Sequence, residues 1–242
     1  KKGFKWEHRF YKHADTVINL ASNEMHYSND RYNQFSSKMK ISDIPLFDKS
    51  TYIDQYVSVI SSTEHLVSFT YAGALSKTLR NPDYACKVFE RLNRIDTEID
   101  VKFFSRGDGG EIISAYHESV SNIGLHDYIP HNDMIKVLEE SDVLISIGNR
   151  HSEMVPSKTF EYISLCKKIV HFYFNYEDPS IRYFKENPLV LLLSEKDDLE
   201  RNVQLVTEFI SNSVKPLSST EMSRIYNDNT PQHTVDLMTI NL

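Results

Sequence analysis

One continuous stretch, residues 142–174, constrains the fold of this chain more than any other part of the sequence. It begins with a short β-branched apolar run, Val143–Ile147, which is typical of a strand buried on both faces. A polar turn follows, and Pro156 stands where a helix would begin, so we predict a helix over residues 158–165. A second apolar run of strand length, Ile169–Phe174, comes next. The stretch therefore predicts a strand–loop–helix–strand unit whose helix begins at one edge of a sheet.

The start of this predicted helix is suited to a phosphate group. We expect Ser157 or Val155 to be the N-cap. The backbone N–H groups of Ser157, Lys158 and Thr159 would then lie free, because the first turn of a helix has no internal acceptors for them. The Lys158 side chain adds a positive charge at the same place.

Two carboxylates flank this position, Glu153 before the helix and Glu161 one turn inside it, with seven residues between them. The segment from Glu153 to Glu161 reads EMVPSKTFE and is followed by Tyr162. It resembles the E-x7-E nucleotide-sugar motif of GT-B glycosyltransferases, in particular the large retaining family with a P-S-K-x-x-E-Y variant. The resemblance extends upstream to about Leu66 and implies the C-terminal, donor-binding domain of that fold.

The remainder of the chain after Leu66 alternates between strand and helix patterns. Such alternation predicts an α/β fold, a Rossmann-like parallel sheet with helices on both faces. Its ligand crevice is expected at the carboxyl ends of the strands. We predict strands at residues 66–72, 100–105, 123–127, 143–147, 169–174 and 189–193, and helices at 83–95, 111–121, 132–141, 158–165 and 197–211.

The first part of the chain has few apolar residues for its length. It reads as a helix, a short strand, a polar helix over Ser22–Phe35, and a strand that ends at Pro45. The resemblance implies that residues 1–46 are the tail of a truncated N-terminal Rossmann-like domain, 47–64 a linker, 65–217 the nucleotide-sugar-binding domain, and 218–242 helices that cross back to the first domain. The chain begins without Met, so we expect it to be a piece of a longer protein.

Two further loops are expected in the crevice. After the leading strand, Gly73 allows close approach of a ligand, and the basic side chains of Lys77 and Arg80 can reach a diphosphate. Relatives often carry Arg directly after this glycine, where the chain has Ala74, so the resemblance assigns the role to Arg80, with Lys77 second. The loop Asp127–Asp133 is the one with which the family holds the base, and Ile129 is the matching position.

The resemblance also implies roles for the two glutamates. Glu161 would accept hydrogen bonds from the ribose hydroxyls, and Glu153 would contact the hydroxyls of the donor sugar. Met154 stands where related motifs have glycine, which bears on the role of Glu153 more than on that of Glu161. The expected reaction is transfer of a sugar from a UDP- or GDP-sugar to a saccharide or lipid-linked acceptor, with Arg80 and Lys158 stabilising the departing diphosphate.

Composition limits the classes of partner that this chain is expected to bind. A net charge of −7 argues against general nucleic-acid binding, and no apolar run is long enough to span a bilayer. Cys86 and Cys166 have no metal-like spacing and are read as reduced thiols in a cytoplasm. Because no D-x-D element or His–carboxylate cluster is present, we expect no metal cofactor. Contact with the inner face of a membrane and a homodimer are further expectations.

Other interpretations stay open at this stage. Glu153 would also fit a solvated loop, and Arg80 and Lys77 would also fit an ordinary charged surface. The segment Arg106–Gly110 is better explained as a tight turn than as a phosphate loop, and His131 as a plain loop residue. Alternative functions are a non-catalytic nucleotide-sugar-binding module and a GT-B-fold UDP-sugar epimerase. If the chain is a transferase fragment, we expect it to bind donor without turnover.

Overall fold

A computed structural model describes residues 2–20, 27–47, 66–95, 98–150, 154–215 and 217–239 of the chain. Within it the chain forms two compact units. The smaller unit contains residues 1–49 and 220–242, and the larger unit contains residues 50–219. Each unit is described by itself.

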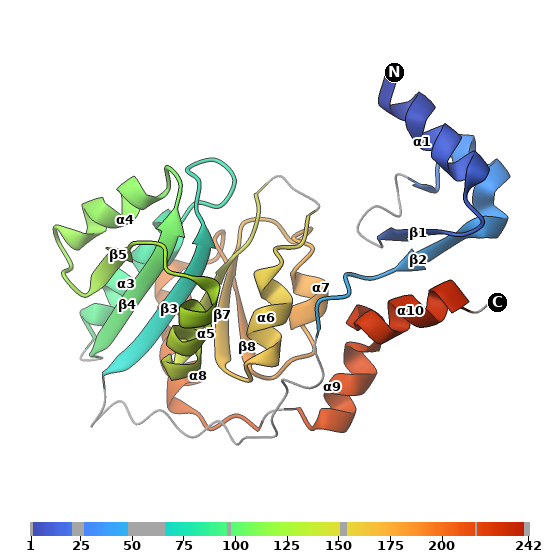
Figure 1. The fold of residues 1–242 in the computed structure, drawn as a ribbon. Coiled ribbons are helices and arrows are strands. Elements are labelled where there is room, and N and C mark those ends of the chain that lie inside the picture. The colour runs from blue at the N-terminus through green and yellow to red at the C-terminus, as the bar shows by residue number, and fades with distance from the viewer. Residues whose placement is uncertain are drawn as a thin grey trace. The chain divides into compact units, whose positions relative to one another are not determined.

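The larger unit is built on a six-stranded sheet, in which every recorded strand pair is parallel. Its strand order is β5-β4-β3-β6-β7-β8 (Figure 1). The strands β3, β4 and β5 are added toward one side of the sheet and β6, β7 and β8 toward the other, so the strand order reverses between β3 and β6. The strands are β3 (Val67–Ala74), β4 (Ile99–Arg106), β5 (Ile123–His126), β6 (Val143–Ile147), β7 (Lys168–Tyr173) and β8 (Val190–Ser194). The predicted α/β fold class is confirmed.

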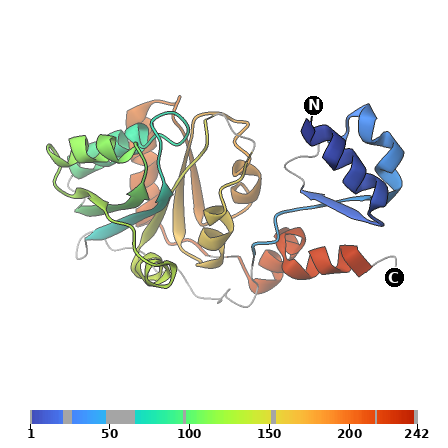
Figure 2. The same cartoon turned by 45° about the horizontal axis from the view of Figure 1, so that its top comes forward.

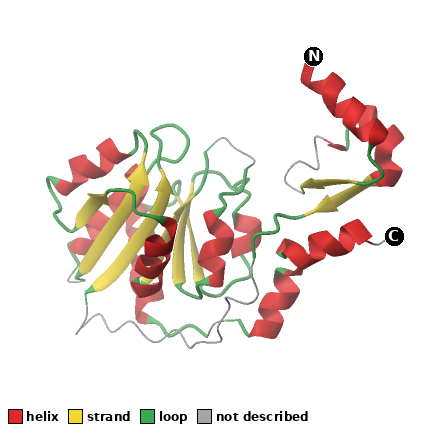
Figure 3. Ribbon diagram, viewed as in Figure 1, coloured by secondary structure: helices red, strands yellow, loops and turns green. Residues whose placement is uncertain are grey.

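Helices cover both faces of this sheet (Figure 3). On one face α3 packs on both α4 and α8, and α5, α6 and α7 lie on the other face. The helices are α3 (Asp83–Asn93), α4 (Gly110–His117), α5 (His131–Glu140), α6 (Lys158–Ser164), α7 (Ile181–Phe184) and α8 (Leu199–Ser211). The four-residue helix α7 was not predicted.

The central strands are apolar because both of their faces are covered. All five residues of β6 and all six of β7 are buried. Register pairs Phe69 of β3 with Val143 of β6, and Ile147 of β6 with Phe172 of β7. The carboxyl ends of β3 and β6 therefore meet at one edge of the sheet, where a doubly wound fold places its ligand crevice.

The turn between α6 and β7 contains two unusual features. Cys166 adopts a left-handed conformation with φ of 51°, at a position where helices commonly end on glycine. Lys168 is fully buried, and its Nζ donates hydrogen bonds of 2.7, 2.9 and 2.7 Å to the carbonyls of Phe209, Ile210 and Asn212. This side chain thus satisfies carbonyl groups at the C-terminus of α8.

The smaller unit combines the two ends of the chain (Figure 2). Its elements are α1 (Lys2–His13), β1 (Val17–Leu20), the 3-10 helix η2 (Asp30–Lys38), β2 (Met39–Ser42), α9 (Ser219–Ile225), the 3-10 helix η4 (Asn227–Asn229) and α10 (Pro231–Thr239). β1 and β2 are parallel. The C-terminal segment packs on the N-terminal one through Phe47, whose N–H donates to the Asn229 carbonyl at 2.9 Å and whose ring lies 5.3 Å from that of Tyr226.

The predicted polar helix over Ser22–Phe35 is wrong within the part that the structure describes. Residues 21–26 lie outside the described ranges, and from Asp30 the chain forms a 3-10 helix instead. The Asn29 side chain accepts from the Arg31 N–H at 3.3 Å, a local bond that competes with regular α-helix. Across the described ranges, no helix has the length and apolar content needed to cross a bilayer.

Candidate functional site

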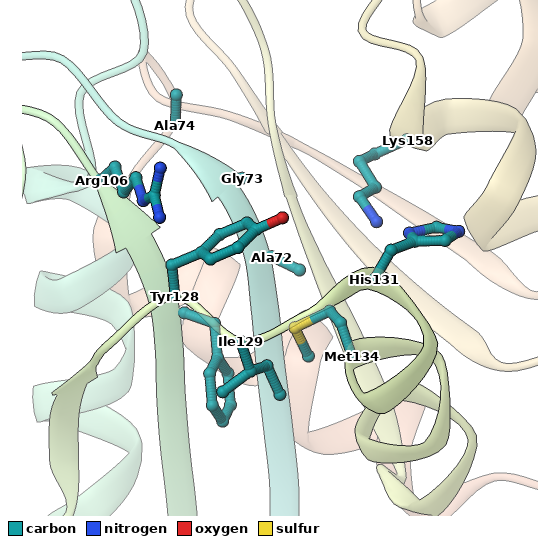
Figure 4. A pocket seen from close by; sticks show the side chains of 10 residues that line it. Ala72, Gly73, Ala74, Arg106, Tyr128, Ile129, His131, Met134 and Lys158 are labelled. Atoms are coloured by element: carbon teal, nitrogen blue, oxygen red, sulfur yellow. The ribbon is translucent and has the colours of Figure 1, made fainter.

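A cavity of about 330 Å³ opens at the carboxyl ends of β3 and β4 (Figure 4). Its floor is the end of β3, and the loop before α5 and the start of α6 form its sides. The residues that line it are Ala72, Gly73, Ala74, Phe104, Arg106, Tyr128, Ile129, His131, Met134 and Lys158. The predicted site residues Gly73, Ile129 and Lys158, which come from three separate segments, therefore border one cavity.

Lys158 and His131 face each other across one end of the cavity (Figure 4). The Lys158 ammonium forms an ion pair with Oε1 of Glu161, one turn further along α6. The other carboxylate oxygen, Oε2, lies 3.9 Å from Nδ1 of His131. The Glu161 side chain is only 22% exposed, so this carboxylate is held between two basic groups at the cavity rim.

Helix α6 is fixed to the sheet by its buried side. Tyr162 accepts a hydrogen bond on its hydroxyl from the Ala72 N–H at 3.0 Å, directly beside Gly73. Burial raises the pKa of Tyr162 far above its ordinary value, so the hydroxyl stays neutral. This contact joins α6 to the end of β3 and sets where Lys158 stands relative to the cavity.

The helix start differs in part from the prediction. Ser157 is the N-cap, as one of the two expected positions, and its side chain makes no capping hydrogen bond. The expectation that the Thr159 N–H lies free is wrong, because it donates to the Pro156 carbonyl at 3.0 Å. The Thr159 side chain is buried, and among the described residues its hydroxyl has no partner. The Thr159 N–H is therefore already bonded within the first turn, and the buried Thr159 side chain faces the protein interior.

Arg80 reaches the same edge of the sheet. Its Nη1 donates to the Ala74 carbonyl at 3.2 Å, next to the cavity floor. Its Nε and Nη2 both donate to Oδ1 of Asn149, at 3.1 and 2.8 Å. Burial raises the pKa of Tyr71 to about 12, and the neighbouring Arg80 charge opposes that rise. The guanidinium is therefore held by neutral acceptors and keeps its charge available to an anion.

Lys77 does not join this arrangement. Its ammonium forms an ion pair with Glu111, and its backbone N–H donates to Asp108 at 3.0 Å. The nearby turn needs its glycines for packing, since a Cβ on Gly107, whose φ is 110°, would lie 2.1 Å from the Leu75 carbonyl oxygen. The tight-turn interpretation of Arg106–Gly110 is confirmed, and Lys77 is directed to α4 instead of the cavity.

Several cavity residues were not singled out from the sequence. Arg106 stacks on Tyr128, with its Cζ 4.0 Å from the ring centroid, and together they form the wall opposite Lys158 (Figure 4). His131 was interpreted as a plain loop residue, yet it lines the cavity. The loop predicted over Asp127–Asp133 is shorter than expected, because α5 already begins at His131, and no local signal indicates which of its side chains turns inward.

A buried polar cluster supports the loop that carries Asn149. Nδ1 of His171 lies 2.9 Å from the Ser146 hydroxyl, and its Nε2 lies 3.6 Å from Oδ2 of Asp178. Burial raises the pKa of Asp178, but the neighbouring His171 ring and the hydrogen bond from the Ser180 N–H outweigh this and leave the pKa below its ordinary value. Gly148 lies so close that a Cβ on it would be 1.7 Å from that carboxylate oxygen.

Glu153 lies outside the described residues. In the ranges that are described, no group of three or more His, Cys, Asp and Glu side chains is placed to hold a metal ion. The cavity can instead hold an anion, because four basic side chains lie at or beside it: Arg80, Arg106, His131 and Lys158.

Comparison with known proteins shows the fold. No protein-family model matches the sequence, and a search of curated proteins found no match. WaaG, a glycosyltransferase involved in lipopolysaccharide biosynthesis, superposes with a TM-score of 0.58 at 10% identity over 98% of this chain and 81% of WaaG. S. aureus TarM, in a complex that contains UDP, gives a TM-score of 0.61 at 13% identity over 98% of this chain and 46% of TarM.

The pneumococcal O-GlcNAc transferase GtfA, in complex with UDP and GlcNAc, gives a TM-score of 0.53 at 12% identity. That match covers 94% of this chain and 44% of GtfA, so the chain spans less than half of both TarM and GtfA. At these identities the likeness shows the fold, which is the Rossmann-like GT-B domain. Activity and substrate are not carried over by it.

Proposed function

We propose that this chain is the donor-binding part of a glycosyltransferase and that its cavity binds a nucleoside diphosphate sugar. The observation that carries the proposal is the convergence of Gly73, Ile129 and Lys158 on one cavity, with Arg80 at its edge. These residues come from three segments that the sequence analysis had already marked. The structural neighbours that are glycosyltransferases, two of them with UDP bound, support the same assignment.

In this proposal the base lies against Ile129 and Tyr128, and the ribose hydroxyls donate to Glu161. An ionised carboxylate accepts hydrogen bonds only, so Glu161 can hold a diol while it stays paired with Lys158. The diphosphate lies between Lys158 and Arg80. Because Arg80 is bound to neutral acceptors, its charge is not cancelled before the ligand arrives.

The chemical step is sugar transfer to an acceptor, with the nucleoside diphosphate as leaving group. Negative charge that develops on the β-phosphate is stabilised by the fixed Arg80 and Lys158 cations, which need no rearrangement at that moment. We propose that no metal is required and that Glu153 contacts the donor sugar. A retaining outcome and a saccharide or lipid-linked acceptor are parts of the same proposal.

The test compares Arg80→Ala with Lys77→Ala in calorimetric titrations of UDP and GDP, each with and without EDTA. Both variants remove one positive charge from the same loop, but only Arg80 lies beside the cavity. Loss of a charged hydrogen-bond donor to a phosphate costs about 1.5–3 kcal/mol, so Arg80→Ala should weaken binding at least tenfold. Lys77→Ala should bind like the unaltered chain. Equal losses, or binding that EDTA abolishes, would contradict the proposal.

A further inference from the structure

Asn149 is the only amide side chain that contacts Arg80 in the described part of the chain, and its geometry is specific. One oxygen, Oδ1, accepts from both Nε and Nη2, at 3.1 and 2.8 Å. The amide nitrogen donates to the Met154 carbonyl at 3.0 Å, which fixes the amide orientation. Asn149 is 8% exposed, so these bonds form in a place that water hardly reaches.

The backbones on either side are tied together as well. The Arg150 N–H donates to the Leu79 carbonyl at 2.8 Å, and the Arg80 carbonyl accepts from Ser76 at 3.0 Å. Arg80 and Asn149 are therefore held at a set separation by backbone bonds as well as by their side chains. Gly148, packed against the Asp178 carboxylate, anchors this loop from the sheet side.

The choice of an amide has an electrostatic consequence. The described hydrogen bonds use three of the five N–H groups of Arg80, and no described carboxylate forms an ion pair with it. A carboxylate at position 149 would accept the same two hydrogen bonds but would cancel the cation, and it could not donate to the Met154 carbonyl. An amide positions the guanidinium and leaves its charge intact.

We propose that Asn149 is a positioning residue that aims Arg80 at the diphosphate of the donor while keeping its charge uncompensated. This inference rests on the proposed function. It predicts that the acceptor at position 149 and the charge at position 149 have different effects on diphosphate binding. Asn149→Asp keeps the acceptor for Arg80 and cancels the charge, at the loss of the bond to the Met154 carbonyl, whereas Asn149→Ala removes the positioning contact.

The matched control is Asn93→Asp. Asn93 also accepts a hydrogen bond on its side-chain oxygen, from Asn122 at 2.6 Å, and it lies at the end of α3, close to the start of β4. The substitution therefore adds the same charge to an accepting amide at the opposite edge of the sheet. Any effect of total charge on nucleotide binding will be seen in Asn93→Asp as well.

The experiment measures the dissociation constants of uridine and UDP, or of guanosine and GDP if the unaltered chain prefers those, together with thermal stability. For Asn149→Asp we expect the diphosphate to bind at least tenfold more weakly and the nucleoside to bind within twofold of the unaltered chain, while a cooperative thermal transition shows that the variant is folded. Asn149→Ala should also lose diphosphate affinity, because the contact that positions Arg80 is gone. Asn93→Asp should change neither affinity.

A purely structural role for Asn149 predicts the opposite pattern. Because a carboxylate bonds arginine more strongly than an amide does, Asn149→Asp would then bind the diphosphate as well as the unaltered chain. That result, with normal binding by the unaltered chain, overturns this inference and leaves the proposed function standing. If the unaltered chain binds neither diphosphate, the proposed function fails and this inference fails with it.

Discussion

Substitution of Gly148 by alanine is predicted to be strongly destabilising. A Cβ at this position would lie 1.7 Å from Oδ2 of Asp178, which is half the 3.4 Å of ordinary contact. Asp178 cannot simply rotate away, because Oδ1 accepts the Ser180 N–H at 2.8 Å and Oδ2 faces His171. Either the carboxylate leaves these partners or the loop that carries Asn149 moves.

Both routes leave buried polar groups unsatisfied, at about 1–3 kcal/mol each, and overpacking adds about 1–3 kcal/mol. We therefore expect Gly148→Ala to lower the free energy of unfolding by about 2–4 kcal/mol in urea titrations followed by circular dichroism. Gly124→Ala is the matched control, because its Cβ would meet only the imidazole end of the exposed His126 side chain, at 3.2 Å. It should cost less than about 1 kcal/mol.

A double-mutant cycle isolates the cause. Asp178→Ala is expected to be destabilising on its own, since it removes the carboxylate that lies 3.6 Å from Nε2 of His171. In that background the obstructing atom is gone, so the additional cost of Gly148→Ala should fall below about 1 kcal/mol. If Gly148→Ala costs the same in both backgrounds, contact with the carboxylate is not what requires glycine at this position.

Three further predictions concern α6 and the turn that follows it. Cys166→Gly should stabilise the chain by about 0.5–1 kcal/mol in thermal unfolding, because glycine accepts the φ of 51° without strain, whereas Cys166→Ala should gain nothing. Burial lowers the pKa of Lys168 to about 8 from 10.5. Between these two pH values the unfolded chain therefore binds more protons than the folded chain. The free energy of unfolding in urea should rise with pH across this window, by at most roughly 3 kcal/mol more than in Lys168→Met. If the difference between the two proteins does not change with pH, this prediction is contradicted. Glu161→Ala should weaken uridine and UDP alike, about tenfold or more in calorimetry, because both carry the ribose, and Glu161→Gln should lose less; unchanged uridine binding would exclude the ribose role.

The sheet was predictable because its signals are local. The uninterrupted apolar runs of β6 and β7 follow from burial on both faces, and Pro156 marks the start of α6 within two residues. The four-residue helix α7 escaped prediction because it is too short for a periodic pattern and depends on the turn that Asp178 makes with Ser180.

The site was predictable only in part, because side-chain pairing across the fold leaves no trace in the local sequence. Lys77 and Arg80 lie in one loop, where the resemblance placed Arg80 first and Lys77 second. The structure supplies the physical reason, since Glu111, 34 positions away, holds Lys77, and Asn149, 69 positions away, holds Arg80. His131 gains its place in the cavity from the tertiary approach of α5 to α6. The resemblance therefore located the crevice and ranked Arg80 above Lys77, but it did not identify Arg106 or His131 as residues of the cavity.

The most direct test of the central claim is a crystal structure of this chain with UDP, and another with GDP, grown in the presence of EDTA. The account predicts one nucleotide in the cavity at the carboxyl ends of β3 and β4, with its base against Ile129 and its diphosphate within hydrogen-bond distance of Arg80 and Lys158. Nucleotide bound at another place, or a diphosphate that touches neither of these two side chains, would contradict it.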